Sequence, residues 1–169
     1  AWPVGIGLPF SKGELKTPET LALVSAQGSL VPLQAKVLDN WPDGSVRWAH
    51  ILFQASLNKQ KTEAWTLRWN GKKAAKPPKT EVKVAKRQGG LPVDTGAIQV
   101  SFATDARNLF QSVKIGGREM LDSGAPNGFT LSTPDGRVFS SFGQTKVNLE
   151  VEESGPLRAI IRLEGVHRS

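Results

Sequence analysis

Short apolar runs separated by glycine and proline extend along the whole sequence, and several of them alternate between apolar and polar residues. The alternation is clearest at residues 146–153, where apolar side chains take turns with charged or amide ones. Comparable runs lie at Pro3–Phe10 and Thr62–Trp69. Because successive side chains of a strand point to opposite faces, this pattern predicts β-strands, whereas no stretch of useful length has helical periodicity. We therefore expect an all-β chain.

The longest paired signal is at residues 33–57, which read as two strands joined by a Trp41-Pro42-Asp43-Gly44 turn. Pro42 pre-sets φ for the first central position of a turn, and Asp43 suits the second. Gly44 can take the left-handed conformation that comes next. These residues predict a type I turn with a glycine bulge, which closes a β-hairpin.

The hydrophobic pattern also predicts the register of this hairpin. If Trp41 lies opposite Ser45, Asp39 faces Arg47, and a one-residue slip would scatter the apolar side chains over both faces. The face with this ion pair is otherwise apolar: Leu33, Ala35, Val37, Ala49, Ile51 and Phe53. The other face is mixed: Gln34, Lys36, Leu38, Asn40, Trp48, His50 and Gln54.

Composition and turns divide the chain into three parts. Residues 1–70 predict a small β-barrel or sandwich core. Residues 71–96 read as a basic connector rich in proline and glycine, with room for one strand at Thr80–Ala85. Residues 97–169 predict an antiparallel, β-sandwich-like region with hairpins at Gly116-Gly117 and Pro134-Asp135-Gly136. Since the sequence stops directly after a strand, we expect this region to be incomplete and the chain to be the front of a longer protein.

Composition removes several classes of site. The 169 residues include no cysteine and no tyrosine, which excludes disulfides, thiolate metal sites and phenolic acids or bases. No apolar run approaches the about 20 residues that cross a bilayer, and no signal peptide is seen. The net charge is +7, but residues 72–87 hold seven basic residues against one glutamate and so supply +6 of it. This favours a solvated basic connector, with contact to an acidic polysaccharide as the alternative, and we expect neither nucleic-acid nor membrane partners.

Few residues suggest chemistry. His50 lies in mid-strand and favours a structural role over that of a general base, and His167 has no second histidine at metal-ligand spacing. Arg47 could recognise a uronate, although Asp39 is its expected partner. Gly5-Ile6-Gly7 has no helix after it, so a dinucleotide site is not expected. No carboxylate pair or nucleophile elbow is evident either. We expect no catalytic residue, no metal and no cofactor in this chain.

The tryptophans allow two interpretations. Trp65 and Trp69 share one face of a predicted strand with Leu67 between them, which favours core packing. Alternatively, these rings could stack on sugars. Trp48, on the mixed face of the hairpin beside His50, has the same two interpretations. We therefore treat Trp48, His50, Trp65 and Trp69 as candidates for contact with a carbohydrate or with a neighbouring domain.

Three motifs resemble a known family. GLPFSKGEL at Gly7–Leu15, VPLQ at Val31–Gln34 and WPDGSVRW at Trp41–Trp48 resemble the N-terminal domain of large secreted proteins typified by exo-acting rhamnogalacturonan lyases. VDTG at Val93–Gly96 and the stretch Val151–Ala159 resemble the region directly after the barrel in such proteins. The resemblance implies a riboflavin-synthase-like (RIFT) β-barrel ahead of an (α/α) toroid, which carries most of the active site, and a C-terminal β-sandwich.

The resemblance also implies a role. It is that of a non-catalytic N-terminal module of a secreted or periplasmic polysaccharide lyase, which braces the catalytic domain as its partner. Ser11 stands where a second proline often appears in the family, and no catalytic motif can be matched to this sequence. A stand-alone carbohydrate-binding module and a structural or interaction domain without sugar binding are the alternatives.

Overall fold

The computed structural model describes residues 2–56, 62–71, 81–87, 90–103, 108–122, 125, 127–141 and 148–165. Its elements are fifteen strands and one 3₁₀ turn, η1 (Pro18–Thr20), which confirms the predicted all-β class. The chain divides into two compact units, Ala1–Lys79 and Thr80–Ser169. In the part that the structure describes, no helix is long and apolar enough to cross a membrane.

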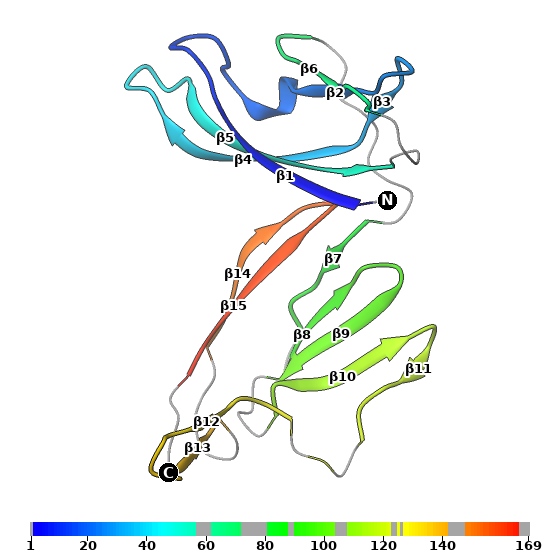
Figure 1. The fold of residues 1–169 in the computed structure, drawn as a ribbon, viewed down its shortest axis with the longest axis vertical. Coiled ribbons are helices and arrows are strands. Elements are labelled where there is room, and N and C mark those ends of the chain that lie inside the picture. Colours follow the sequence, from blue (N-terminus) through cyan, green and yellow to red (C-terminus); the bar gives the residue numbers. More distant parts are fainter. Residues whose placement is uncertain are drawn as a thin grey trace. The chain divides into compact units, whose positions relative to one another are not determined.

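The first unit consists of two antiparallel sheets of three strands each, and Figure 1 shows them on opposite sides of the unit. One sheet has the order β1 (Trp2–Pro9), β5 (Val46–Ala55), β4 (Leu33–Asn40). The other has the order β3 (Leu30–Val31), β2 (Ala22–Val24), β6 (Thr66–Arg68). Strand β6 is shorter than the predicted Thr62–Trp69, so Trp65 and Trp69 flank it.

The core of the first unit confirms the predicted apolar face of the hairpin. Ala49 and Ile51 are buried in one cluster with residues of the preceding loops, and Phe53 is buried in a second. Leu33, Ala35 and Val37 of β4 pack against these clusters. Burying branched and aromatic side chains in this way contributes about 1.5–3 kcal/mol for each one fully removed from water, so this face fixes the hairpin's register.

The predicted register is correct along most of the hairpin and wrong near the turn. Pairs from Leu33 with Phe53 to Val37 with Ala49 are as expected, but Asp39 then pairs with Trp48. The reason is two compensating irregularities, with Leu38 as the extra residue on β4 and Arg47 as the extra residue on β5. Asp39 and Arg47 are therefore not opposite each other in the ladder, but the expected ion pair between their side chains is confirmed at 3.1 Å.

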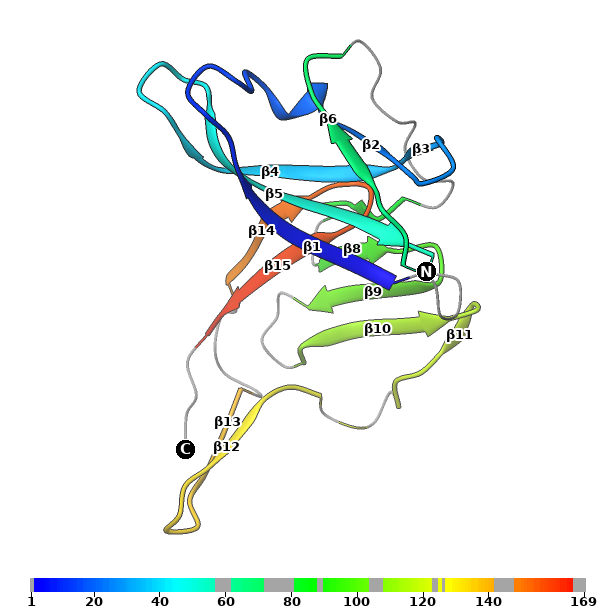
Figure 2. The same cartoon turned by 45° about the horizontal axis from the view of Figure 1, so that its top comes forward.

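The second unit contains a five-stranded antiparallel sheet and two separate hairpins. Figure 2 shows β8, β9 and β10 of the large sheet side by side. The sheet order is β11 (Arg118–Glu119), β10 (Phe110–Ile115), β9 (Ile98–Ala103), β8 (Gly90–Asp94), β7 (Lys83–Val84). The hairpins are β12 (Thr130–Ser132) with β13 (Val138–Ser140), and β14 (Asn148–Ser154) with β15 (Ala159–Glu164).

The range 71–96, for which the sequence predicts a connector with one strand, holds two strands of this sheet, β7 and β8. The sequence of β8 is typical of a connector because Gly90 and Pro92 interrupt it, and β7 is only two residues long. Gly90 is the first residue of β8, and there is little space for a side chain beside its Cα. A Cβ at that position would lie 2.7 Å from Gln111 Oε1. The glycine therefore permits close packing within a sheet instead of marking a loop.

Both predicted hairpin turns are confirmed. Gly116 and Gly117 have φ of 57° and 80°, as a two-residue turn of the primed type requires. At the second turn, Gly136 N donates to Thr133 O at 2.9 Å, and Gly136 has φ of 84°. This repeats the geometry around Gly44, where φ is 82°.

Ion pairs join the two strands of the β14–β15 hairpin. Arg162 lies 2.5 Å from Glu150 and 3.4 Å from Glu152. Arg158 pairs with Glu153 at 2.8 Å, beside a bulge at Glu152 that shifts the register. Several predictions, for residues 72–79, 146–147 and His167, lie outside the described residues.

Candidate functional site

The hairpin turn of the first unit is closed by its own polar groups. Gly44 N donates to Trp41 O and Trp41 N donates to Ser45 O, each at 2.8 Å. Asp43 Oδ1 accepts from the Ser45 hydroxyl at 2.6 Å and from Ser45 N at 3.1 Å. These bonds, of which the bond from the Ser45 hydroxyl has the largest effect, hold the pKa of Asp43 below its ordinary value. Asp43 therefore serves the turn and is poorly suited to carry a proton near neutral pH.

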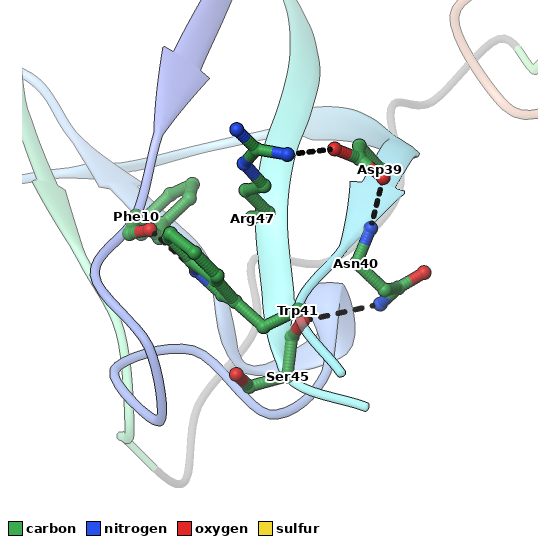
Figure 3. A network of polar contacts seen from close by, with 6 residues as sticks. All are labelled: Phe10, Asp39, Asn40, Trp41, Ser45 and Arg47. Carbon is green, nitrogen blue, oxygen red and sulfur yellow. Dashed lines mark hydrogen bonds and ion pairs between the residues drawn. The ribbon is translucent and has the colours of Figure 1, made fainter. Parts of the chain in front are cut away.

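Beside the turn, a chain of contacts links the hairpin to the end of β1, as Figure 3 shows. Arg47 Nη1 lies 3.1 Å from Asp39 Oδ2, and the Arg47 guanidinium carbon lies 5.0 Å from the centre of the Trp41 ring. Trp41 Nε1 donates to Phe10 O at 3.0 Å. Asn40 also belongs to this network, and its backbone N donates to Asp39 Oδ1. The guanidinium is thus held between a carboxylate and an aromatic face.

These residues surround an open hollow of about 480 Å³, which we call the first-unit hollow. Its walls are the rings of Phe10, Trp41 and Trp48, the Asp39–Arg47 pair, and Pro9 and Leu38. Aromatic rings beside a cation are the groups that recognise a sugar ring bearing a carboxylate. The groups in the lining are suited to such contacts.

Two glycines of β1 give the rings on the mixed face their place. A Cβ at Gly7 would lie 2.8 Å from Trp48 Nε1, and one at Gly5 would lie 3.0 Å from His50 Nε2. The indole and imidazole rings therefore lie against the bare backbone of β1. In the sequence these glycines are considered for a dinucleotide motif, and Gly7 also begins the GLPFSKGEL motif, but their role in packing was missed. Their spacing of two residues along a strand that pairs with the aromatic strand was the available signal.

The structure does not gather the four candidate contact residues into one site. Trp48, 41% exposed, lines the hollow, and Trp69, 37% exposed, touches its Phe10 wall edge-on at 5.7 Å. Trp65 is half-buried and packs 6.0 Å from Phe53 in the second core cluster. His50 is half-buried over Gly5, outside the lining of the hollow.

Within the ranges that the structure covers, no group of three or more histidine, aspartate or glutamate side chains is placed to hold an ion. At the hollow, the one carboxylate in the lining, Asp39, is paired with Arg47. The hollow accordingly offers a cation and aromatic surface for binding, with Asp39 serving to position Arg47.

Comparison with known protein families matches both units. Residues 2–70 match the PcRGLX-like N-terminal RIFT barrel domain, and residues 82–169 match the PcRGLX-like protein central beta sandwich domain. The chain belongs to the PcRGLX-like family. This confirms the RIFT barrel and the β-sandwich that the motifs and the alternation predicted. The PcRGLX-like assignment places the first-unit hollow on the RIFT barrel and the five-stranded sheet in the central sandwich domain.

A curated relative extends beyond the two domains. The PcRGLX-like chain is 26% identical over 170 residues to the uncharacterized protein YetA of Bacillus subtilis (strain 168). The match covers 95% of this chain and 19% of YetA. The chain thus spans about a fifth of the length of that relative, whose name assigns it no activity.

Proposed function

We propose that this chain is the non-catalytic N-terminal part of a larger polysaccharide-degrading enzyme, a lyase of the rhamnogalacturonan type, and that it braces the catalytic domain. The two domain matches and the 19% share of YetA support a place within a longer protein. The resemblance of the sequence motifs to rhamnogalacturonan lyases supports the substrate class. By the same resemblance, we place the whole protein in the secreted or periplasmic compartment.

The observation that carries the bracing role is the exposed apolar face of the β12–β13 hairpin. Leu131 lies opposite Phe139, and Phe129 is two residues before Leu131 on the same face. Phe129 is 55% exposed and Leu131 is 54% exposed. A two-stranded hairpin is marginally stable in water by itself. Exposed aromatic and aliphatic side chains on such a hairpin are the pattern of a surface that another domain covers. We call Phe129, Leu131 and Phe139 the docking face.

The chemistry of the first-unit hollow supports the non-catalytic role. A lyase must neutralise the uronate carboxylate and remove the proton from C5 with a base. Arg47 could meet the first need but is paired with Asp39 at 3.1 Å. His50, the imidazole that the structure describes, lies outside the hollow lining. A cation and a base therefore do not converge at this hollow.

The direct test compares this chain with the full-length protein on rhamnogalacturonan. Unsaturated product is followed by its ultraviolet absorbance. We expect product from the full-length protein and none above background from residues 1–169 at equal molar concentration, because the described residues bring no cation and base together at the hollow. Turnover by the isolated chain would overturn the non-catalytic role. An inactive full-length protein on this polymer would overturn the proposed substrate class.

A further inference from the structure

The five-stranded sheet of the second unit has a polar face, separate from the first-unit hollow. The register places Lys83, Asp94, Gln99 and Lys114 opposite one another on β7, β8, β9 and β10. Directly opposite residues of antiparallel strands project from the same face of a sheet. The four polar side chains therefore form one row across four strands, whereas the neighbouring row on the reverse face is made of valines.

The next row on the polar face is built from small side chains. Pro92 lies opposite Ser101, and Ala85 N donates to Pro92 O at 3.0 Å. At Gly90, an added Cβ would lie 2.7 Å from Gln111 Oε1 and 3.1 Å from Phe102 O, so a side chain here would displace the glutamine amide. Small residues between rows of long ones leave a groove of about 620 Å³, which we call the second-unit groove.

The second-unit groove carries positive charge. Four of its lining side chains are ionisable: Lys83, Arg87, Lys114 and Asp94. Three cations against one carboxylate give the lining a formal charge of +2, and all three cations are exposed. The carboxylate is engaged locally, since Asp94 Oδ1 accepts from Gly96 N at 2.7 Å and Asp94 Oδ2 accepts from Gln99 Nε2 at 3.0 Å. Glu119 of β11 lies opposite Lys114 and continues the row, but it accepts from the Ser112 hydroxyl and from Val113 N. Glu119 is not part of the lining, which therefore keeps a net positive charge that can attract an external anion.

The groove also offers neutral hydrogen-bonding groups between its cations. The Ser101 hydroxyl donates to Gln111 Oε1 at 3.2 Å, which fixes the orientation of that amide beside the small row. Gln99 is likewise oriented by its bond to Asp94. Oriented amides among lysines and an arginine suit a ligand that presents both carboxylates and hydroxyls.

We propose that the second-unit groove binds an acidic oligosaccharide, with uronate carboxylates on its lysines and arginine and sugar hydroxyls on its amides. This inference rests on the proposed function, because the groove would let the bracing module bind the acidic polysaccharide that its enzyme degrades. The lining contains no aromatic ring on which a nucleic-acid base could stack. Binding in this groove therefore rests on charge and hydrogen bonds alone, and the oriented amides between the cations suit the hydroxyls of a sugar acid.

The test is a calorimetric titration of the 169-residue chain with tetragalacturonide at low ionic strength, where exposed charges are least screened. The variant is the double substitution Lys83→Gln and Lys114→Gln, which removes both ends of the charged row. Since each exposed charge contact is modest, we expect affinity to fall about fivefold to tenfold. The matched control, Lys12→Gln with Lys16→Gln on the first unit, makes the same charge change and should alter affinity less than about twofold.

Two further measurements remove dependence on the folding of the variants. In the unsubstituted chain, the Gln99 and Gln111 side-chain amide resonances should shift on addition of tetragalacturonide. The fully methyl-esterified tetramer should bind about tenfold more weakly, because its carboxylates are blocked. Equal losses in both double variants, equal binding of the ester, equal binding of a single-stranded DNA oligonucleotide, or no binding at about 10 mM sugar would each refute the site. Such a result leaves the bracing role intact, since that is read from the full-length enzyme.

Discussion

Single glycines position the rings on the mixed face of the first unit. Gly7 is the clearest case, because a Cβ at this position would lie only 2.8 Å from Trp48 Nε1. Real side-chain carbons essentially never approach other heavy atoms that closely, so either the ring or the strand must move. The exposed indole is the more mobile of the two. The missing side chain of Gly7 therefore determines the position of the Trp48 ring in the lining of the first-unit hollow.

We expect Gly7→Ala to displace the Trp48 ring and to lower the free energy of unfolding by about 1 kcal/mol, the low end of the cost of overpacking. Urea unfolding and acrylamide quenching of tryptophan fluorescence measure the two effects. Gly71→Ala is the control, since nothing lies within 4 Å of its added Cβ, and should change stability by no more than about 0.5 kcal/mol. Identical behaviour of the two variants would show that the glycine does not position the ring.

At the scale of elements, carboxylates tie the ends of several hairpins. Glu119 of β11 is the strongest example, because its Oε2 accepts from the Ser112 hydroxyl at 2.5 Å and its Oε1 accepts from Val113 N at 2.9 Å. The amides of Met120 and Leu121 also donate to it. The bond from Ser112 has the largest effect, and together with the bonds from these amides it lowers the pKa of Glu119 to about 2. The carboxylate thus replaces ladder partners that the two-residue strand β11 cannot supply.

This bonding predicts an acid-labile contribution to stability. A carboxyl whose pKa is lower in the folded state stabilises the fold above its unfolded pKa, and that contribution disappears as the carboxyl is protonated. For Glu119 the loss should therefore run from its ordinary pKa of 4.5 down to about 2. Urea midpoints of the chain and of Glu119→Gln, measured at intervals across this range, should converge as the pH falls. A constant gap between the two midpoints would contradict the assignment.

Elements with local signals could be predicted from sequence. The turns at Gly44, Gly117 and Gly136 were found because their residue types are dictated by their own backbone angles. The apolar face of the first hairpin was found because a single register buries it. The bulges at Leu38 and Glu152 were missed because turn chemistry and alternation do not reveal where a strand gains a residue.

The candidate site was less predictable than the fold. Aromatic residues such as Trp48 stand out in a sequence, but their grouping depends on which strands pair. The hollow joins the end of β1 to a turn about 30 residues later, as the bond from Trp41 to Phe10 shows. The second-unit groove was hidden for the same reason, since Lys83 and Lys114 become neighbours in one row only through β8 and β9. Strands β7 and β8 also lack a strong apolar run.

At the scale of the whole molecule, the chain consists of two β domains of the PcRGLX-like family and spans 19% of the length of YetA. The docking face of the β12–β13 hairpin is the surface on which the proposed bracing role depends. Its outer residues, Phe129 and Leu131, are more than half exposed. If the catalytic domain covers them, polar substitution there should weaken the full-length protein much more than the isolated chain.

The most direct measurement is the thermal unfolding midpoint of the full-length protein. Leu131→Gln removes apolar surface from the docking face, and we expect the midpoint to fall by several degrees, since a buried apolar side chain contributes about 1.5–3 kcal/mol. Val138→Gln is the matched control, because Val138 is 59% exposed on the opposite face of the same hairpin. A midpoint lowered by Leu131→Gln and unchanged by Val138→Gln is the result expected of a brace. Equal midpoints in the two variants would contradict it.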